Sequence, residues 1–224
     1  MISVIIPTLN EVQIIESALR DLMTRNGEFE VIVVDGGSRD GTVEIARRYA
    51  RVLSSPAGRA IQMNRGAAAA RGETLLFLHA DCRLPANAFS AIETVLTQDG
   101  IVGGGFTVTF DEDHLKLKVI ALGGRIRQRL TGVIYGDQGM FVRRDLFKWL
   151  GGFKEIPLME DVVFSKRLKQ VGRIAFLEEQ IRTSGRRFLQ EGAMKSIFRI
   201  FLFNLLYRFK VHPKRLANHY GDVR

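Results

Sequence analysis

Carboxylate side chains stand at three separate points of the sequence, each at the end or the start of a regular element. Asp35 follows one apolar run, Asp81 follows another, and Glu160 and Asp161 open a helical stretch. Carboxylates accept hydrogen bonds from a base or ribose, bind divalent cations and take protons from attacking hydroxyls. These residues therefore point to nucleotide, metal and acid-base chemistry.

The loop that contains Asp35 reads VDGGSRDGT, and its glycines let the backbone turn tightly and approach a ligand. An aspartate directly after a buried strand can accept hydrogen bonds from a nucleobase or ribose. An equally good interpretation is an Asx-turn followed by a helix that Asp40 or Thr42 caps. The loop lacks the G-x-G-x-x-G spacing of a dinucleotide site, which counts against a nicotinamide enzyme.

The segment FLHAD places His79 and Asp81 two residues apart after an apolar strand, so both side chains can face the same way. An imidazole and a carboxylate are reasonable ligands for Mn²⁺ or Mg²⁺ when a diphosphate supplies further oxygens. The alternative is that Asp81 caps a helix near Leu84-Pro85. Glu160 and Asp161 have a structural alternative too, because acidic residues at a helix start interact favourably with the helix dipole.

A further candidate lies at the start of a predicted helix, where Gly58 precedes Arg59. Backbone N–H groups at a helix N-terminus, together with the guanidinium, suit an anionic group. Asn64 follows in the same helix. The alternative is that Arg59 is solvated and that Met63 belongs to the core.

Short β-branched runs alternate with helical stretches through the first hundred residues. Continuous apolar strands that are crossed over by helices are typical of a parallel sheet covered on both faces. In such a sheet ligands bind at the carboxyl ends of the strands, which is where the polar loops begin. The predicted strands cover residues 3–7, 29–34, 52–54, 74–78, 106–110 and 140–142, and the predicted helices cover 11–25, a stretch from about 42, 59–70, 114–130 and 162–171.

Length and composition suit one globular domain, since 46% of the 224 residues are hydrophobic and 25% are charged. The single cysteine, Cys82, excludes an internal disulfide, and the first residues lack the pattern of a secretory signal. The longest uncharged apolar stretch near the C-terminus, residues 200–207, is far shorter than the roughly 20 residues that span a bilayer. We therefore expect a cytoplasmic protein without a transmembrane helix.

Basic charge is concentrated near the C-terminus. The net charge is +9, and residues 182–224 hold ten Lys or Arg against Glu191 and Asp222, which leaves +8 in this part of the chain. The apolar stretch 194–209 is interspersed with basic residues, so it could lie on an anionic membrane, or pack on the enzyme body or a second subunit. Nucleic acid is not expected as a partner, because these basic residues sit among long apolar side chains rather than stacking aromatics.

Taken in order along the chain, these motifs resemble those of family 2 glycosyltransferases with the GT-A fold. The resemblance covers nearly the whole chain and implies an α/β fold with a mostly parallel central sheet and helices on both faces. Three segments, GRAIQMNRGAAAARGE, LLFLHADCRLP and YGDQGMFVRR, are similar to a bacterial subgroup often described as transferases of arsenosugar-type pathways. The pieces that match the family are Pro7-Thr8-Leu9-Asn10-Glu11, Val33-Val34-Asp35-Gly36-Gly37-Ser38 with Asp40-Gly41-Thr42, Phe77-Leu78-His79-Ala80-Asp81 and Glu160-Asp161.

The resemblance also implies roles for the matching residues in an inverting transfer of sugar from a nucleoside diphosphate, with UDP-linked donors as the first expectation. Asp161 would be the general base with Glu160 beside it, and Asp81 would meet Mn²⁺ or Mg²⁺ and the diphosphate. His79 stands where the family has its first acid, so its role as metal ligand or sugar contact is open. The remaining expected contacts are Pro7, Thr8, Asn10, Glu11, Asp35, Gly36, Ser38, Arg59 and Asn64 for the nucleotide, Asp137 and Gln138 for the donor sugar or acceptor, and Arg186 and Arg187 for a lid.

Two other classes of protein stay open. A nucleotidyltransferase would share the sheet, although PTLNEVQ lacks the glycine-arginine-lysine signature of that class. A binding module would keep the nucleotide pocket without turnover. We expect the transferase domain to cover residues 1–190 and a basic amphipathic tail to cover 191–224, packed on the domain or at a membrane surface. The sequence does not specify the acceptor.

Overall fold

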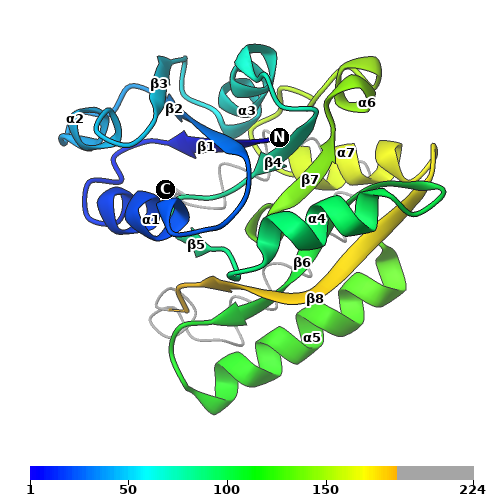
Figure 1. Cartoon of the computed structure of the whole chain (residues 1–224). Coiled ribbons are helices and arrows are strands. Elements are labelled where there is room, and N and C mark those ends of the chain that lie inside the picture. The colour runs from blue at the N-terminus through cyan, green and yellow to red at the C-terminus, as the bar shows by residue number, and fades with distance from the viewer. Residues whose placement is uncertain (186–224) are drawn as a thin grey trace.

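The computed structural model describes residues 1–185, which form a curled sheet with helices packed on it (Figure 1). The strand order in this eight-stranded sheet is β3-β2-β1-β4-β7-β6-β8-β5. The predicted tail, residues 191–224, lies outside the described residues. Within residues 1–185, no helix combines the length and the apolar character that crossing a membrane requires.

The first half of the described chain follows the predicted alternation. Parallel strands β1 (Ile2–Thr8), β2 (Phe29–Asp35), β3 (Arg51–Ser54) and β4 (Thr74–Phe77) are connected by α1 (Ile15–Met23), α2 (Thr42–Ala46) and α3 (Arg59–Ala69). Thr8 pairs in register with Asp35, so β1 and β2 end at the same level of the sheet. The polar loops that follow these strands therefore begin side by side.

The second half adds short antiparallel pairings to the mostly parallel sheet. Strand β7 (Met140–Arg143) runs antiparallel to both β4 and β6 (Ile101–Phe110), whereas β8 (Arg173–Thr183) runs parallel to β6. A short strand, β5 (Cys82–Arg83), pairs antiparallel with β8. The sequence pattern did not predict β5, β8, α4 (Ala88–Leu96) or α6 (Arg144–Trp149), while α5 (Leu115–Thr131) and α7 (Glu160–Leu168) lie where helices were predicted.

Three consecutive glycines, residues 103–105, lie inside β6 rather than before it, so the prediction of a strand confined to residues 106–110 was wrong at its start. A Cβ added to Gly104 would collide with the Ala175 carbonyl and the Phe141 ring. Glycine is needed there because neighbouring backbone and an aromatic ring approach the strand too closely for a side chain.

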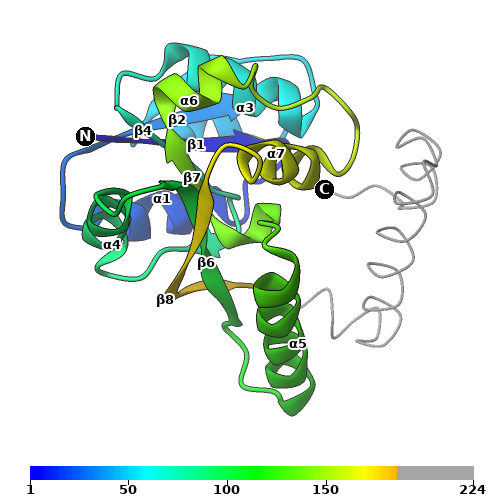
Figure 2. The same cartoon turned by 90° about the vertical axis from the view of Figure 1, so that its right-hand side faces the viewer.

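Strand side chains alternate between two hydrophobic cores, one on each face of the sheet. Ile6 and Val33 belong to one cluster with residues of α1 and α4, whereas Ile5 and Ile32 belong to the other with residues of α3, α6 and α7. Figure 2 shows α1 and α4 on one side of the sheet and α3 and α6 on the other. This two-sided burial explains why the strands read as continuous apolar runs.

Candidate active site

The loops after β1 and β2 are joined to each other by hydrogen bonds. The Asn10 amide donates to Ser38 Oγ at 2.8 Å, and the Glu11 amide donates to Thr42 Oγ1 at 2.8 Å. The Val12 amide donates to Asp40 Oδ2 at 3.1 Å. Two segments about 30 residues apart in the chain thus form one edge of the predicted nucleotide site.

Asp35 is 4% exposed, and its carboxylate is already engaged by its own loop. Oδ2 accepts from the amides of Gly37 at 2.8 Å and Ser38 at 2.9 Å, and Oδ1 accepts from the hydroxyls of Ser38 at 2.5 Å and Thr8 at 3.4 Å. The Asx-turn is therefore present, but the N-cap of α2 is Gly41 rather than Asp40 or Thr42. The four hydrogen bonds occupy the usual acceptor capacity of the Asp35 carboxylate. The assignment of Asp35, Gly36 and Ser38 to the nucleotide stays a prediction.

Asn10 adopts a left-handed backbone with φ of 55°, a conformation that costs little for asparagine and more for most other residues. Its Oδ1 accepts from the Arg39 amide at 3.0 Å. The same side chain that favours the turn therefore also holds the second loop in place. Pro7, which was predicted to contact the nucleotide, is half-buried within β1.

Gln62 in α3 belongs to this edge as well, although the sequence did not predict a role for it. Its side chain is 3% exposed, and Nε2 donates at 2.8 Å to the carbonyls of both Thr8 and Val34. It therefore connects the carboxyl ends of β1 and β2 to each other and to α3. In the sequence this residue is only a glutamine in the first turns of a helix that follows a polar loop. That position does not reveal that its side chain bonds to backbone carbonyls 28 and 54 positions away in the chain.

Replacing this glutamine should test how far the edge depends on it. Gln62→Met keeps the side-chain volume but removes both donors from buried carbonyls, which should cost about 1–3 kcal/mol of unfolding free energy. We expect a lower melting temperature and weaker nucleotide binding, measured by thermal melting and calorimetric titration. Gln98→Met, at an exposed position without such contacts, is the control. Equal behaviour of the two variants would show that Gln62 does not organise the edge.

His79 and Asp81 follow β4, as predicted, and lie beside the segment around Asp137. The Cys82 thiol lies 3.6 Å from Asp81 Oδ1 and 3.7 Å from the Asp137 carbonyl, which connects the two segments. Asp81 is exposed. The helix-cap alternative for Asp81 is not what forms, because the chain enters β5 at Cys82 and α4 begins only at Ala88.

Burial and neighbouring negative charge raise the pKa of two carboxyl groups in this region. Burial, together with the charges of Asp81 and Asp40, raises the pKa of Glu11 to about 7. The pKa of Asp137 is raised as well, first by burial and then by Asp161 and Asp81, although Arg127 and His79 oppose the shift. Burial lowers the pKa of His79, which favours a neutral imidazole with a nitrogen available to accept or to bind a metal.

This surplus of negative charge fits a cation at Asp81. Residues 1–185 contain no group of three or more His, Cys, Asp and Glu side chains that could hold a metal ion alone. Asp81, with His79 beside it, stays the predicted metal site, at which a diphosphate would supply further oxygens. The exposure of the Asp81 carboxylate is compatible with that prediction.

Asp161, at the start of α7, meets His79 across Gly136. Its Oδ2 accepts from the Gly136 amide at 2.6 Å, and its Oδ1 accepts from the Val162 amide at 2.7 Å. A Cβ added to Gly136 would lie 2.7 Å from the His79 ring and 3.5 Å from Asp161 Oδ2, so a glycine is required for the three to pack. The carboxylate predicted to be the base thus lies beside the loop that carries the metal candidates.

Glu160 is buried at 3% exposure and forms an ion pair with Arg59, whose Nε lies 3.1 Å from Glu160 Oε1. Burial and the charge of Asp161 raise the pKa of Glu160 to about 6, although Arg59 lowers it. The Glu160 Oε2 atom is buried and makes no hydrogen bond within residues 1–185. Met159, just before it, holds a left-handed φ of 70°, a costly conformation of the kind that clusters at functional sites.

The pairing of Arg59 with Glu160 predicts a pH-dependent stability for a variant. In Arg59→Gln the buried carboxylate loses its cation, so its pKa rises and its ionisation in the folded state becomes less favourable. The penalty is absent when Glu160 is protonated and grows as pH rises through about 6. We expect the melting temperature of Arg59→Gln to approach the native value near about pH 5 and to fall below it near about pH 8. A difference that does not change over that range would contradict the pairing.

Asp137 and Gln138 lie in the 3-10 helix η1 (Gly136–Gln138), which α5 holds in place. Gln138 is buried, and its Oε1 accepts from the Tyr135 amide at 2.8 Å while its Nε2 donates to Gln128 at 3.1 Å. The Arg127 guanidinium lies 3.8 Å from the centre of the Tyr135 ring. Gln138 thus acts within the protein, and contact of Asp137 or Gln138 with a sugar stays a prediction.

Asn64 and the two lid arginines are the other residues that were predicted for the site. Both polar atoms of the Asn64 amide bond the backbone of Phe153 at 2.9 Å, which fixes the loop before α7 to α3. Its contact with a nucleotide stays a prediction. Arg186 and Arg187, the predicted lid, lie outside the described residues.

Comparison with known proteins places the sequence in one family. The profile of Glycosyl transferase family 2 matches residues 3–150. A PGL/p-HBAD biosynthesis glycosyltransferase of Mycobacterium bovis is 40% identical over 162 residues, which cover 68% of this chain and 52% of that protein. A dolichyl-phosphate beta-glucosyltransferase of Drosophila melanogaster is 33% identical over 179 residues, covering 68% and 53%. The chain thus spans about half the length of these relatives.

Solved structures share the fold at lower identity. A mannosyltransferase of Pyrobaculum calidifontis, in complex with GDP-Man and Mn²⁺, has a TM-score of 0.65 at 21% identity and covers 82% of this chain and 56% of its own. TarS 1-349 of S. aureus, in complex with UDP-GlcNAc, has a TM-score of 0.60 at 20% identity and covers 82% and 58%. These likenesses confirm the predicted GT-A fold. By the match over residues 3–150 and the identity to its relatives, the chain belongs to glycosyl transferase family 2.

Proposed function

We propose that the protein transfers a sugar from a nucleoside-diphosphate sugar to an acceptor hydroxyl, with inversion at the anomeric carbon. The observation that carries the proposal is the meeting of His79 and Asp161 at Gly136, which brings the loop after β4 to the start of α7. The metal candidate and the base candidate come from segments about 80 residues apart in the chain. Family membership supports the reaction class.

In this proposal the nucleotide lies along the joined loops after β1 and β2, with Thr8, Asn10, Glu11, Asp35, Gly36 and Ser38 nearby. Asp81, with His79, would hold Mn²⁺ or Mg²⁺, which would stabilise the negative charge that develops on the departing diphosphate. The Mn²⁺ in the Pyrobaculum mannosyltransferase supports a divalent ion here. Arg59, paired with Glu160, would add positive charge on the same side.

Asp161 would take the proton of the attacking hydroxyl at its carboxylate. Two backbone amides fix both of its oxygens, so the carboxylate is held in one orientation and need not reorganise during the reaction. Glu160, with an unbonded buried Oε2, is suited to accept a hydrogen bond from the acceptor or from a water molecule. Attack from the side opposite the diphosphate would give inversion.

The donor can be found by a thermal-shift screen of nucleoside diphosphates and their sugars, each with and without Mn²⁺. UDP-linked donors are the first expectation, and GDP-linked donors are the main comparison, since the structural neighbours carry one or the other. A ligand at about 100 times its dissociation constant adds about 2.7 kcal/mol to the unfolding free energy, so the melting temperature should rise by several degrees. The gain should require the metal.

Turnover separates the proposal from its alternatives. An active transferase should slowly release nucleoside diphosphate from the stabilising donor even with water as acceptor. A nucleotidyltransferase would instead release pyrophosphate from a sugar phosphate and a nucleoside triphosphate. Binding of a donor without any release, with every acceptor tried, would favour the non-catalytic module. The arsenosugar-type subgroup and a membrane contact of the C-terminal tail stay predictions.

A further inference from the structure

Helix α5 exposes a row of large apolar side chains along its whole length. Their exposed fractions lie between 51% and 80%. Positions spaced by three and four residues fall on one side of a helix, so the row forms a continuous stripe. The α5 stripe consists of Leu115, Val119, Leu122, Ile126 and Leu130.

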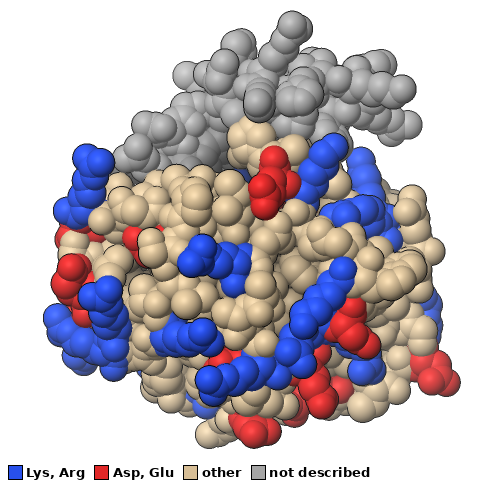
Figure 3. All heavy atoms as spheres, turned by 90° about the horizontal axis from the view of Figure 1, so that it is seen from above, with Lys and Arg blue, Asp and Glu red and all other residues tan. Residues whose placement is uncertain are grey.

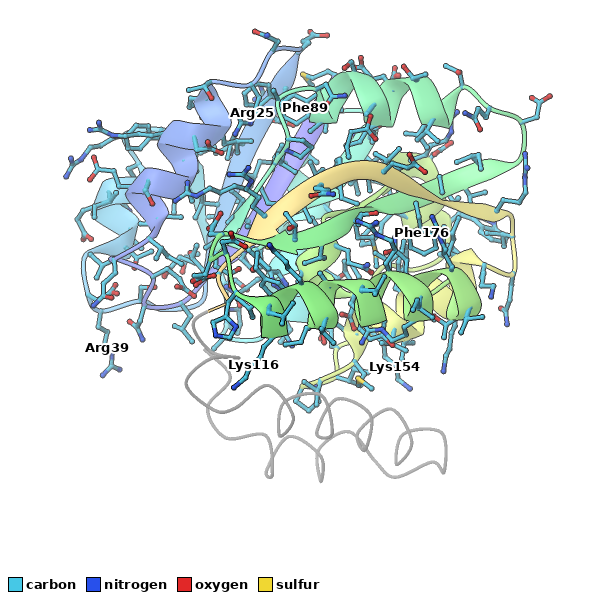
Figure 4. All side chains as sticks on the ribbon, turned by 90° about the horizontal axis from the view of Figure 1, so that it is seen from below. Arg25, Arg39, Phe89, Lys116, Lys154 and Phe176 are labelled. Carbon is cyan, nitrogen blue, oxygen red and sulfur yellow. The ribbon has the colours of Figure 1, made fainter. Side chains whose placement is uncertain are left out.

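The stripe points away from the protein. The buried residues of α5 are Leu117 and Gln128, which lie on the opposite side of the helix from Leu122 and Ile126. In the view of Figure 4, α5 runs alongside β6 and β8 with no described element drawn over it, and Lys116 extends from the start of the helix. The apolar stripe is therefore not the core-facing side of an amphipathic helix.

Basic side chains border the stripe on both sides. At 100° per residue, Lys116 falls on one side of it, and Lys118, Arg125 and Arg129 fall on the other, whereas the Arg127 guanidinium stacks on the Tyr135 ring. Residues 115–131 contain no acidic residue. An apolar ridge flanked by basic side chains is the arrangement by which a helix lies in the interface of an anionic bilayer.

Three acidic residues, at positions 111–113, stand just before the helix, and two of them are already paired. Lys118 Nζ lies 2.6 Å from Asp113 Oδ1, and Glu112 accepts from the Ser184 hydroxyl at 3.2 Å and the Gly185 amide at 2.7 Å. The C-terminal half of α5, with three arginines, is therefore the more cationic end of the surface.

No other element of residues 1–185 carries such a stripe. The remaining exposed large apolar side chains, Met1, Met23, Trp149 and Val171, come from separate elements. Figure 3 views the side of α3 and α6, and there Lys and Arg are spread over the surface with acidic side chains between them. Among the elements of residues 1–185, a row of exposed apolar side chains beside basic ones is found only on α5.

We propose that the outer face of α5 docks on an anionic membrane surface. The stripe would enter the region between headgroups and acyl chains, and the flanking lysines and arginines would contact lipid phosphates. The other side of α5 holds η1 through the contacts of Arg127 with Tyr135 and of Gln128 with Gln138. Docking would thus hold the loop of Asp137 one helix diameter, roughly 10 Å, from the lipid surface.

Vesicle sedimentation of the full chain tests the proposal. Vesicles of phosphatidylcholine alone are compared with vesicles in which about a third of the lipid is phosphatidylglycerol. Native protein should bind the anionic vesicles strongly and the neutral ones weakly. Leu122→Gln with Ile126→Gln should reduce binding at least about tenfold, because two apolar side chains no longer enter the interface. Lys116→Gln with Arg129→Gln, both at exposed positions, should reduce binding to anionic vesicles only.

Trp149→Gln is the matched control, since Trp149 is 72% exposed on α6, at the other end of the molecule from α5 (Figures 1 and 2). Melting temperatures show whether each variant is folded. Undiminished binding by the folded stripe variant would overturn the proposal and assign any membrane contact to another segment. A native dimer that the stripe variant abolishes, without vesicle binding, would overturn it in favour of a subunit interface. Neither result depends on transferase activity.

Discussion

Asp161→Asn is expected to reduce sugar transfer by at least about 100-fold while leaving donor affinity within about twofold. The substitution keeps the shape of the side chain and one acceptor oxygen, so one of the bonds to the Gly136 and Val162 amides can persist. It removes the basic oxygen that the proposed reaction needs. Transfer is measured as nucleoside diphosphate released with saturating donor, and affinity by calorimetric titration.

Asp145→Asn is the matched control for this variant. Asp145 also stands in the first turn of a helix, α6, and its Oδ1 accepts from the next amide at 2.7 Å, as that of Asp161 does. A loss of activity confined to Asp161→Asn then reports on the site rather than on helix capping. Full transfer by folded Asp161→Asn would show that the base is a different residue, and Glu160 would be the next candidate.

Asp81→Asn should abolish the metal dependence of donor binding. The carboxylate is exposed, and the hydrogen bond that it accepts from the Cys82 thiol is weak, so its removal should hardly change the melting temperature of the free protein. A preorganised cation at a departing diphosphate contributes several kcal/mol to the transition state, so transfer should fall by about 100-fold or more. The measurement is donor titration with and without Mn²⁺, followed by transfer at saturating metal.

Asp99→Asn provides the comparison, because Asp99 is equally exposed but precedes β6, at the edge of the sheet opposite the site. It should bind the donor with the native requirement for metal. If Asp81→Asn retains that requirement as well, the metal is held by other residues, and the role of metal ligand that the family resemblance implies for Asp81 is wrong.

The continuous apolar runs of the sequence predicted the parallel half of the fold, because both faces of those strands are buried. Ile5 and Ile6 enter different cores, so β1 reads as an uninterrupted apolar run. The second half was harder to predict. Strand β8 has several half-exposed positions and carries the charged pair Glu178-Glu179, so it lacks an apolar run. Strand β6 contains Gly104 because residues distant in the chain approach too closely for a side chain, which the sequence does not show.

Likewise, only some residues of the candidate site could be predicted from the sequence. Asp35, His79 and Asp81 could be identified because they lie at or just after the carboxyl ends of β2 and β4, where ligand-binding loops begin. Gln62 and Arg127 could not, since their importance comes from contacts with distant backbone and with the Tyr135 ring. The sequence also could not show that Asp35 and Asn64 have hydrogen-bond partners within the protein.

The central claim is that loops far apart in the sequence bind one metal-neutralised nucleoside diphosphate. Amide hydrogen exchange, followed with and without a stabilising donor and Mn²⁺, tests it most directly. We expect slower exchange together in residues 8–12, 36–42, 79–82, 136–138 and 159–162, and no change in α4. Protection restricted to a single one of these segments, or found only elsewhere, would contradict the account.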